Sequence, residues 1–101
     1  MIQRIVCFKF KPNTTPTAIQ SHMDHFARLS VEIHQIQSYS GGLTVADEHG
    51  NLPEYDSLHI ATYHSMTEVE TYFHHPAHQE FIEAHREIWA KVLVLNSEVP
   101  S

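Results

Sequence analysis

Four stretches of the chain are rich in β-branched, aromatic and aliphatic side chains, and each predicts a β-strand. In the first, "IQRIVCFKF", Val6 and Phe8 share one face with Arg4, whereas Ile5 and Cys7 lie on the opposite face. Both faces are partly apolar, so we expect both sides of this strand to be covered. The predicted strands are residues 2–10, 37–46, 57–63 and 92–99.

The second strand contains the pair Gly41-Gly42, which suggests a bulge or a close approach of another group to the backbone. The segment "DEHGNLPEYD" that follows it is rich in turn-forming residues and predicts a loop.

Between the strands, apolar residues recur at helical spacing. The segment "TTPTAIQSHMDHFARLSVEIHQI" predicts a helix with Thr15 as its N-cap and Pro16 at its first position. One apolar stripe runs along this helix in alternating steps of four and three residues, interrupted by a serine, and we expect it to face the core. The stripe consists of Ile19, Met23, Phe26, Ser30 and Ile33.

Two shorter helices are predicted in the second half of the chain. The first, "SMTEVETYF", begins with Ser65 and Glu68 in the spacing of a capping box. Pro76 ends it and can begin the next helix, "PAHQEFIEAHREIWAKV", whose end overlaps the start of the last strand. The predicted inner stripe of this last helix is Phe81, Ala84, Ile88 and Val92.

The predicted order of elements is β-α-β-β-α-α-β, in which two β-α-β halves flank a central hairpin. This order is typical of the α+β ferredoxin-like class, a four-stranded antiparallel sheet with helices on one face. The other sheet face would be bare in a monomer and carries Ile5 and Cys7, so we expect a homodimer that covers this face and forms a dimeric α/β barrel.

Composition narrows the classes of protein. The 101 residues predict a single domain, 1–101, and the net charge of -6 with six scattered basic residues gives no patch for nucleic acid. No apolar run is long enough for a membrane span, and "MIQRIVCFKFK" lacks the features of a secretory signal. The one cysteine, Cys7, is expected to be buried and unreactive, which fits a cytoplasmic protein.

Ten histidines are the unusual feature of the composition, and three of them lie in "TYFHHPAHQEF". His74 and His78 have the four-residue spacing of a helical zinc pair, but Pro76 interrupts the helix between them. We therefore expect no native metal site and no cofactor. In the plainest interpretation, His75 caps the last helix and His78 packs at its start; in the alternative, Tyr72 and His78 form a site.

The segments "RIVCFKFKP", "YSGGLTV", "YDSLHIATY" and "YFHHPAHQEFI" occur in the order and spacing of the stress-responsive A/B barrel (Dabb) family, which the chain resembles over essentially its whole length. The resemblance implies a small homodimer whose two sheets pack face to face. Most members have no assigned chemistry, but one plant branch closes a linear polyketide by an intramolecular aldol step.

In that branch a tyrosine and a histidine act in this motif, and the matching positions here are Tyr72 and His78. The histidine is the base, and an acidic residue of the last strand orients it; the amide Asn96 stands at that position here. Two further histidines of the cleft correspond to Arg4 and Ser57. The central pair is therefore retained while its surroundings differ.

These residues are compatible with several functions. The leading hypothesis is a pocket between helices and sheet that binds a small hydrophobic or β-keto molecule. The expected catalytic residues are Tyr72, His78 and Asn96, and the expected ligand-binding residues are Arg4, Phe26, Ser57, His75 and Trp89. The alternatives are a cyclase-like lyase with His78 as base and Tyr72 as donor to the oxyanion, a structural stress protein, and a monooxygenase of a related barrel group.

Overall fold

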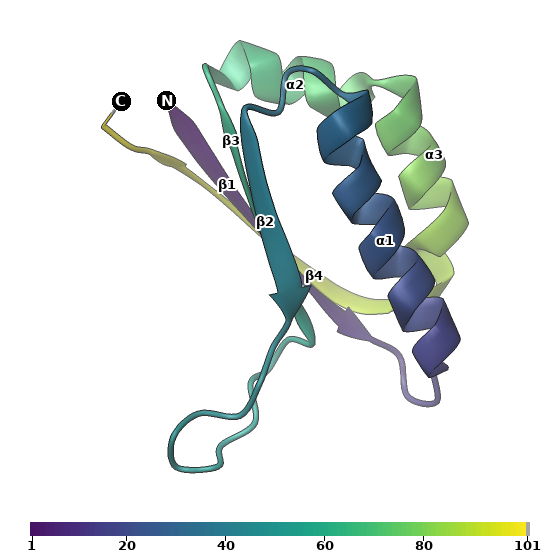
Figure 1. Ribbon diagram of the computed structural model, residues 1–101. Helices are drawn as coiled ribbons and strands as arrows, with labels where there is room; N and C mark the ends of the chain where they lie inside the picture. Colours follow the sequence, from purple (N-terminus) through teal and green to yellow (C-terminus); the bar gives the residue numbers. More distant parts are fainter. Residues whose placement is uncertain (101) are drawn as a thin grey trace.

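The computed structural model describes residues 1–100 and contains one sheet with helices on a single face (Figure 1). The elements are β1 (Ile2–Phe10), α1 (Pro16–Glu32), β2 (Ser38–Leu43), β3 (Ser57–Tyr63), α2 (Met66–His74), α3 (Pro76–His85), a short 3-10 helix (Arg86–Ile88) and β4 (Trp89–Glu98). The strands lie in the order β2-β3-β1-β4, and each neighbouring pair is antiparallel. The predicted order of elements and the ferredoxin-like class are confirmed.

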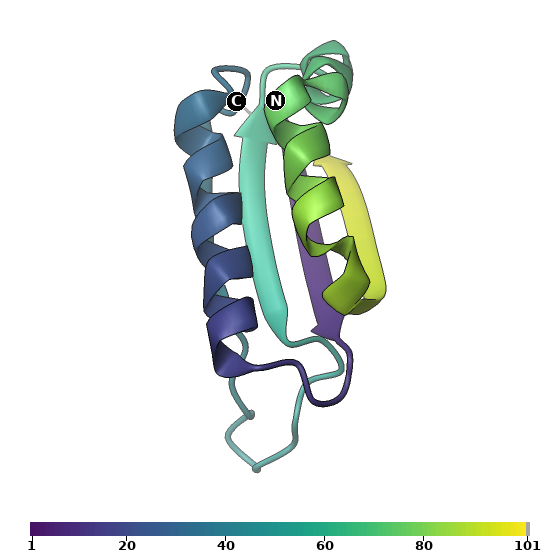
Figure 2. The ribbon, with the colours of Figure 1, turned by 90° about the vertical axis from the view of Figure 1, so that its right-hand side faces the viewer.

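The helices α1 and α3 lie along the sheet, and α2 crosses one end of it (Figure 2). α1 begins where the sequence predicts, because the Thr15 hydroxyl accepts a hydrogen bond from the Ala18 N–H at 3.1 Å. α2 begins with the predicted cap as well, from the Glu68 N–H to the Ser65 hydroxyl. Within residues 1–100, none of the helices has both the length and the apolar character that a membrane span requires.

The stripe of α1 that faces the sheet is partly different from the predicted one. Phe26 and Ile33 are buried as expected, but Leu29 and His22 are both fully buried in place of Ser30 and Met23. The observed stripe keeps steps of three and four residues and is rotated slightly around the helix axis. The prediction was wrong at these two positions because a histidine takes an interior place that the apolar pattern assigned to a methionine.

The last helix is shorter than predicted. α3 ends at His85, and Trp89 already belongs to β4, opposite Phe10 of β1. The residues predicted as the end of this helix pair with β1 as the start of β4. The inter-strand hydrogen bonds outweigh the helical pattern of the sequence. Two predicted inner positions are therefore wrong: Ala84 is exposed, and Val92 is a strand residue. The second strand is also shorter than predicted, Ser38–Leu43 rather than 37–46.

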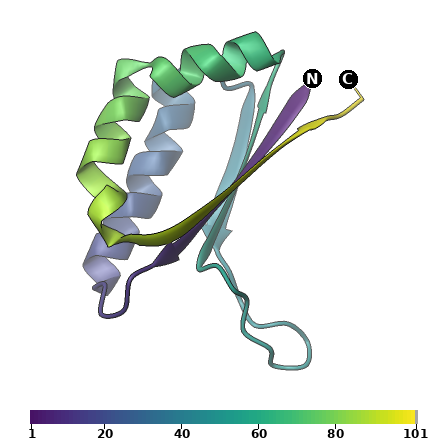
Figure 3. The same ribbon diagram turned by 180° about the vertical axis from the view of Figure 1, so that it is seen from behind.

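The sheet face opposite the helices has no element over it in residues 1–100 (Figure 3). The register places six apolar side chains on it in two rows that cross β3, β1 and β4. Several of them are partly exposed, and Leu95 reaches 53% exposure. The rows are Ile60, Ile5, Leu95 and Leu58, Cys7, Leu93.

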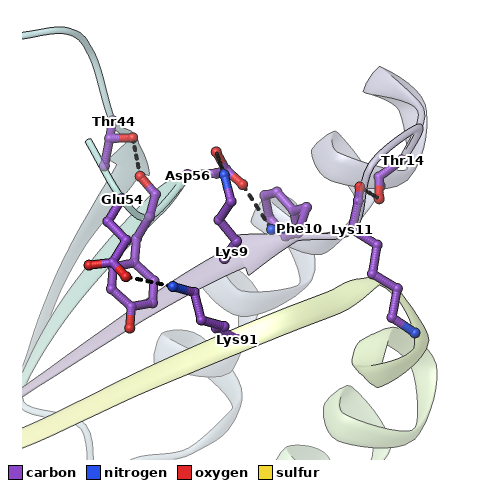
Figure 4. Close-up of polar contacts among 9 residues, drawn as sticks. Lys9, Phe10, Lys11, Thr14, Thr44, Glu54, Asp56 and Lys91 are labelled. Carbon is purple, nitrogen blue, oxygen red and sulfur yellow. Dashed lines mark hydrogen bonds and ion pairs between the residues drawn. The ribbon is translucent and has the colours of Figure 1, made fainter. Parts of the chain in front are cut away.

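The connection between β2 and β3 projects beyond the end of the sheet, and polar contacts fix its base (Figure 4). The Asp56 carboxylate accepts a hydrogen bond from the Phe10 N–H at 2.8 Å and lies 3.7 Å from the Lys9 ammonium. Nearby, Lys91 of β4 donates to the carboxylate of Glu54 at 2.5 Å. The exposed ion pairs add little stability, but together they tie the loop to β1 and β4.

The observed orientation of α1 predicts that two truncations on this helix lower the free energy of unfolding by very different amounts. Leu29→Ala removes a fully buried side chain and should lower the free energy of unfolding by about 2–5 kcal/mol. Val31→Ala on the same helix, where Val31 is 86% exposed, should change it by less than about 0.5 kcal/mol. Urea unfolding at one protein concentration measures both, and similar losses in the two variants would contradict the observed orientation of α1.

Candidate functional site

A cavity of about 130 Å³ lies between α2, α3 and the half of the sheet formed by β1 and β4. Three polar side chains line it: Arg4 from β1, Tyr72 from α2 and His78 from α3. The two helices therefore bring together the pair that the sequence singled out, although the proline break lies between them. Val92 and Val94 of β4 also line the cavity and are 43% and 41% exposed, so it opens past this edge of the sheet.

The remaining wall is aromatic. Phe26 and Trp89, which the sequence predicted to line a pocket, both belong to the lining. Phe81 of α3 is almost fully buried and packs edge-on to Phe26, with 5.2 Å between ring centroids. An apolar wall with a few polar groups is typical of a site for a small organic molecule.

Pro76 creates the geometry at the junction of the two helices. It stands at the first position of α3, and His75 before it has extended backbone angles, so α2 ends at His74. The His75 ring accepts a hydrogen bond from the Ala77 N–H at 3.0 Å and caps α3. His75 was expected to bind ligand, but the structure uses it as the helix cap and leaves it outside the cavity lining.

The break leaves the carbonyl of Phe73 without a continuing helical partner, and two side chains of α3 supply hydrogen bonds instead. His78 Nδ1 lies 2.9 Å from this oxygen, and Gln79 Nε2 lies 2.6 Å from it. A carbonyl oxygen can only accept, so Nδ1 of His78 carries the proton and Nε2 has a free lone pair when the ring is neutral.

Burial lowers the pKa of His78 below its ordinary value; the bond to Phe73 opposes this effect, and the charge of Arg4 adds to it. The ring is therefore neutral at pH 7. A neutral histidine with a fixed tautomer and an unprotonated Nε2 is suited to act as a general base.

Tyr72 lies against His78, with 4.5 Å between the two ring centroids, and its side chain is 2% exposed. Burial raises the pKa of Tyr72 to about 12, although Arg4 acts in the opposite direction. The phenol is therefore protonated at neutral pH and can donate a hydrogen bond. The guanidinium carbon of Arg4 lies 5.9 Å from the centre of the Tyr72 ring, within the range of a cation–π contact.

Asn96 lies beside Arg4, its neighbour across the β1–β4 ladder, and not beside His78. Its side-chain oxygen accepts a hydrogen bond from Arg4 Nη1 at 3.1 Å. The residue expected to orient His78 thus holds Arg4, and the backbone of Phe73 takes the orienting role. This corrects the predicted contact between Asn96 and His78.

Ser57, another predicted ligand-binding residue, lies on the other half of the helix-covered sheet face, under α1. It is fully buried, and its hydroxyl has no hydrogen-bond partner within residues 1–100. Two histidines missed by the sequence interpretation lie on this half as well: His22 of α1 and His59 of β3 are almost completely buried. Their rings are 6.1 Å apart between centroids, and both pack against Phe8.

Burial lowers the pKa of His22 to about 3 and that of His59 to about 4, so both rings are neutral in the folded protein. The nearby rings of His59, His85 and His25 further lower the pKa of His22. The available signal for His22 was its spacing of four and seven residues from Phe26 and Leu29, which forms a helical stripe as regular as the predicted one.

Two further contacts involve histidines. His25 of α1 and His85 of α3 share a hydrogen bond of 2.8 Å that links the helices. His59 Nδ1 lies 2.8 Å from the Tyr39 hydroxyl, and a Cβ at Gly41 would lie only 2.8 Å from the same nitrogen and closer still to that hydroxyl. The predicted close approach at the glycine pair is therefore observed at the first glycine. No three potential metal ligands of residues 1–100 are grouped so as to hold a metal ion.

The family model of the Stress responsive A/B Barrel Domain matches residues 2–99, and the chain belongs to this family. The Arabidopsis thaliana protein At3g17210 has a similar structure, with 27% identity, a TM-score of 0.85 and coverage of 100% of this chain and 97% of that one. A hydroxynitrile lyase from Passiflora edulis is 17% identical over 98% of this chain and 93% of its own, with a TM-score of 0.87.

A dimeric ferredoxin-like protein of unknown function from Thermobifida fusca is 19% identical, with a TM-score of 0.83 and coverage of 97% of this chain and 90% of that one. At such identities the likeness of the lyase and of this dimeric protein concerns the fold alone. The search of curated proteins found no match.

The two neutral core histidines predict a stability that falls on mild acidification. Below pH 6.5 the unfolded chain binds protons at these rings and the folded chain does not, so folding is increasingly opposed as the pH falls from 6.5 toward 4. Each ring contributes a slope that approaches about 1.4 kcal/mol per pH unit.

Urea unfolding between pH 7 and pH 5 measures this slope. His22→Leu should reduce it by the share of one ring, whereas His49→Leu, at a side chain that is 76% exposed, should leave it unchanged. An identical pH slope in the wild type and His22→Leu would refute the assignment of His22 as a neutral buried group.

Proposed function

We propose that the protein binds a small organic molecule in the cavity and acts on it as a carbon–carbon lyase or cyclase, with His78 as the base. The observation that carries this proposal is the hydrogen bond from His78 Nδ1 to the Phe73 carbonyl, because it leaves Nε2 as the basic nitrogen of a ring that packs against Tyr72. Two groups with opposite tasks thus meet in one apolar cavity: a neutral base and a protonated phenol.

The proposed reaction begins at a carbon next to a carbonyl group. His78 Nε2 takes a proton from this carbon, and the electron pair of the C–H bond moves to the carbonyl oxygen, which becomes an enolate. The Tyr72 hydroxyl donates a hydrogen bond to this oxygen and stabilises the developing charge.

In the closing direction, the enolate carbon attacks a second carbonyl of the same molecule and forms a carbon–carbon bond. The new alkoxide then takes the proton back from the imidazolium of His78, so the atoms of the substrate are unchanged in number. In the reverse direction the same steps cleave a β-hydroxy ketone. The hydroxynitrile lyase among the structural neighbours supports the choice of class, because this architecture hosts a lyase there.

The size of the cavity restricts the substrate. A cavity of about 150 Å³ holds a benzene molecule, and this one measures about 130 Å³. We expect a compact body of that size inside, with any longer chain leaving past Val92 and Val94, where the cavity is open.

We also propose that the protein acts as a homodimer joined through the bare sheet face. Two rows of three apolar side chains cover this face, and a second copy would remove them from water. The dimeric state of the Thermobifida fusca neighbour supports the same arrangement. A twofold dimer would keep the cavity of each copy on the far side of its own sheet.

Replacement of the base tests the proposed reaction. In a panel of small β-diketones, β-hydroxy ketones, cyanohydrins and keto acids, His78→Gln should lower kcat for any converted compound by about 10²–10⁴-fold, since a glutamine amide can still reach the Phe73 carbonyl but offers no basic nitrogen. Tyr72→Phe should lower kcat by about 10²–10³-fold. Product formation is followed by mass spectrometry.

His74→Gln is the matched control, because His74 belongs to the same motif but is exposed and lies outside the cavity lining. It should keep wild-type turnover. Wild-type turnover in His78→Gln, or no conversion of any compound by the wild-type protein, would reject the proposed chemistry.

A charge introduced on the apolar sheet face tests the proposed dimer. Leu95→Asp places a carboxylate in the apolar rows and should convert the protein to a monomer in sedimentation analysis, because the charge would have to be buried against the second copy. Val31→Asp on the outer surface of α1 should remain dimeric. A dimeric Leu95→Asp protein would place the interface elsewhere.

A further inference from the structure

Arg4 brings a permanent positive charge to the cavity wall, and no acidic side chain stands among the cavity lining. The polar partners around it are neutral: Tyr72 is a protonated phenol, His78 is a neutral imidazole, and Asn96 is an amide. Within residues 1–100, no carboxylate lies within ion-pair distance of Arg4. The cavity therefore carries one uncompensated positive charge.

Contacts with Asn96 and Tyr72 fix the position of the Arg4 guanidinium. Its Nη1 donates to the Asn96 oxygen at 3.1 Å, its carbon lies 5.9 Å from the centre of the Tyr72 ring, and its Nε is shielded without a hydrogen-bond partner in residues 1–100. A charge that is partly removed from water and lacks a counter-ion is costly, and the cost falls when an anion binds beside it. Its planar N–H groups match the paired oxygens of a carboxylate or a phosphate, and the apolar wall of the cavity favours the carboxylate of an organic acid.

Position and size define the rest of the ligand. Asn96 is exposed at the edge strand, so the charged end of Arg4 lies toward the open side of the cavity, and the almost fully buried Phe81 lies deeper. The space of about 130 Å³ suits an apolar body of roughly the size of a benzene ring.

We infer that the ligand of this cavity is a small monocarboxylate with an aromatic or branched apolar body, whose carboxylate pairs with Arg4. The inference rests on the proposed function, since it takes the cavity as the ligand site. The reacting carbonyl is then a second group of the same anion, and the carbon next to that carbonyl lies beside Tyr72 and His78. It adds the substrate class: an organic acid anion in preference to a neutral ketone or amide.

Calorimetric titration with two matched probes tests this. Benzoate and benzamide share one body and differ in charge: both can accept a hydrogen bond from the guanidinium, but only benzoate brings a negative charge that compensates it. Benzoate should bind the wild-type protein at least about tenfold more tightly than benzamide. Inorganic phosphate, which lacks an apolar body, should compete weakly.

Two substitutions locate the effect. Arg4→Met keeps much of the side-chain bulk and should abolish the preference for benzoate. Asn96→Asp is nearly isosteric, supplies a carboxylate beside Arg4 and should abolish the same preference while the guanidinium stays in place. Arg28→Met, at an exposed arginine of α1 outside the cavity lining, is the control and should keep the wild-type ratio.

The outcomes separate this inference from the proposed reaction. Equal affinities for benzoate and benzamide, no saturable binding of benzoate at millimolar concentration, equal binding of phosphate, or an unchanged preference in both cavity variants would overturn the carboxylate assignment. Turnover of neutral ketones that depends on His78 would still support the lyase. Conversely, a benzoate preference lost in Arg4→Met without any turnover would support the carboxylate site and reject the reaction.

Discussion

The hydrogen bond between His78 Nδ1 and the Phe73 carbonyl is the interaction on which the site depends. It exists because Pro76 stops α2 and begins α3, which leaves a helix-end carbonyl free to accept from a side chain. A continuous helix would give that oxygen a backbone donor. The same junction places Tyr72 on one helix and His78 on the other, so a single proline sets both the tautomer of His78 and its aromatic neighbour. Backbone geometry here performs the task that a carboxylate performs in many histidine sites.

The helix-covered face of the sheet has two halves of different chemistry. Beside β4 the packing is loose enough to leave a cavity whose apolar wall carries three polar side chains, one of them a cation. Beneath α1 the packing is tight, and polar rings fill positions that aliphatic side chains would normally occupy, with His22 and Ser57 fully buried. Phe8 lies where the two halves meet, since its ring contacts both His22 and Trp89. Burying these neutral histidines opposes folding, and the burial of the surrounding aromatic and aliphatic side chains favours it.

The fold was predictable because its signals are local and agree with one another. The caps at Thr15 and Ser65 and the break at Pro76 mark helix boundaries in the sequence, and the order of elements then selects the ferredoxin-like class. The site was predictable in part: Arg4 and His78 both line the cavity. The features that the sequence did not predict depend on tertiary contacts. Strand pairing, and not local pattern, ends the last helix before Trp89.

The hydrogen-bond acceptor that orients His78, the Phe73 carbonyl, was also not predicted. Side-chain identities predicted a side-chain acceptor, and a backbone carbonyl cannot be recognised in a sequence because every residue has one. His22 was missed because hydropathy ranks histidine as a surface residue; its helical spacing from Phe26 and Leu29 was the one signal in the sequence, and the aromatic rings packed around it show that it is buried.

The contact of Tyr39 with His59 has an evolutionary consequence. The hydroxyl and the ring nitrogen occupy the space above the Gly41 backbone, so no side chain can be added there while both remain. A relative with alanine or serine at this position must have changed the tyrosine or the histidine as well. Positions 39, 41 and 59 should therefore covary in related sequences.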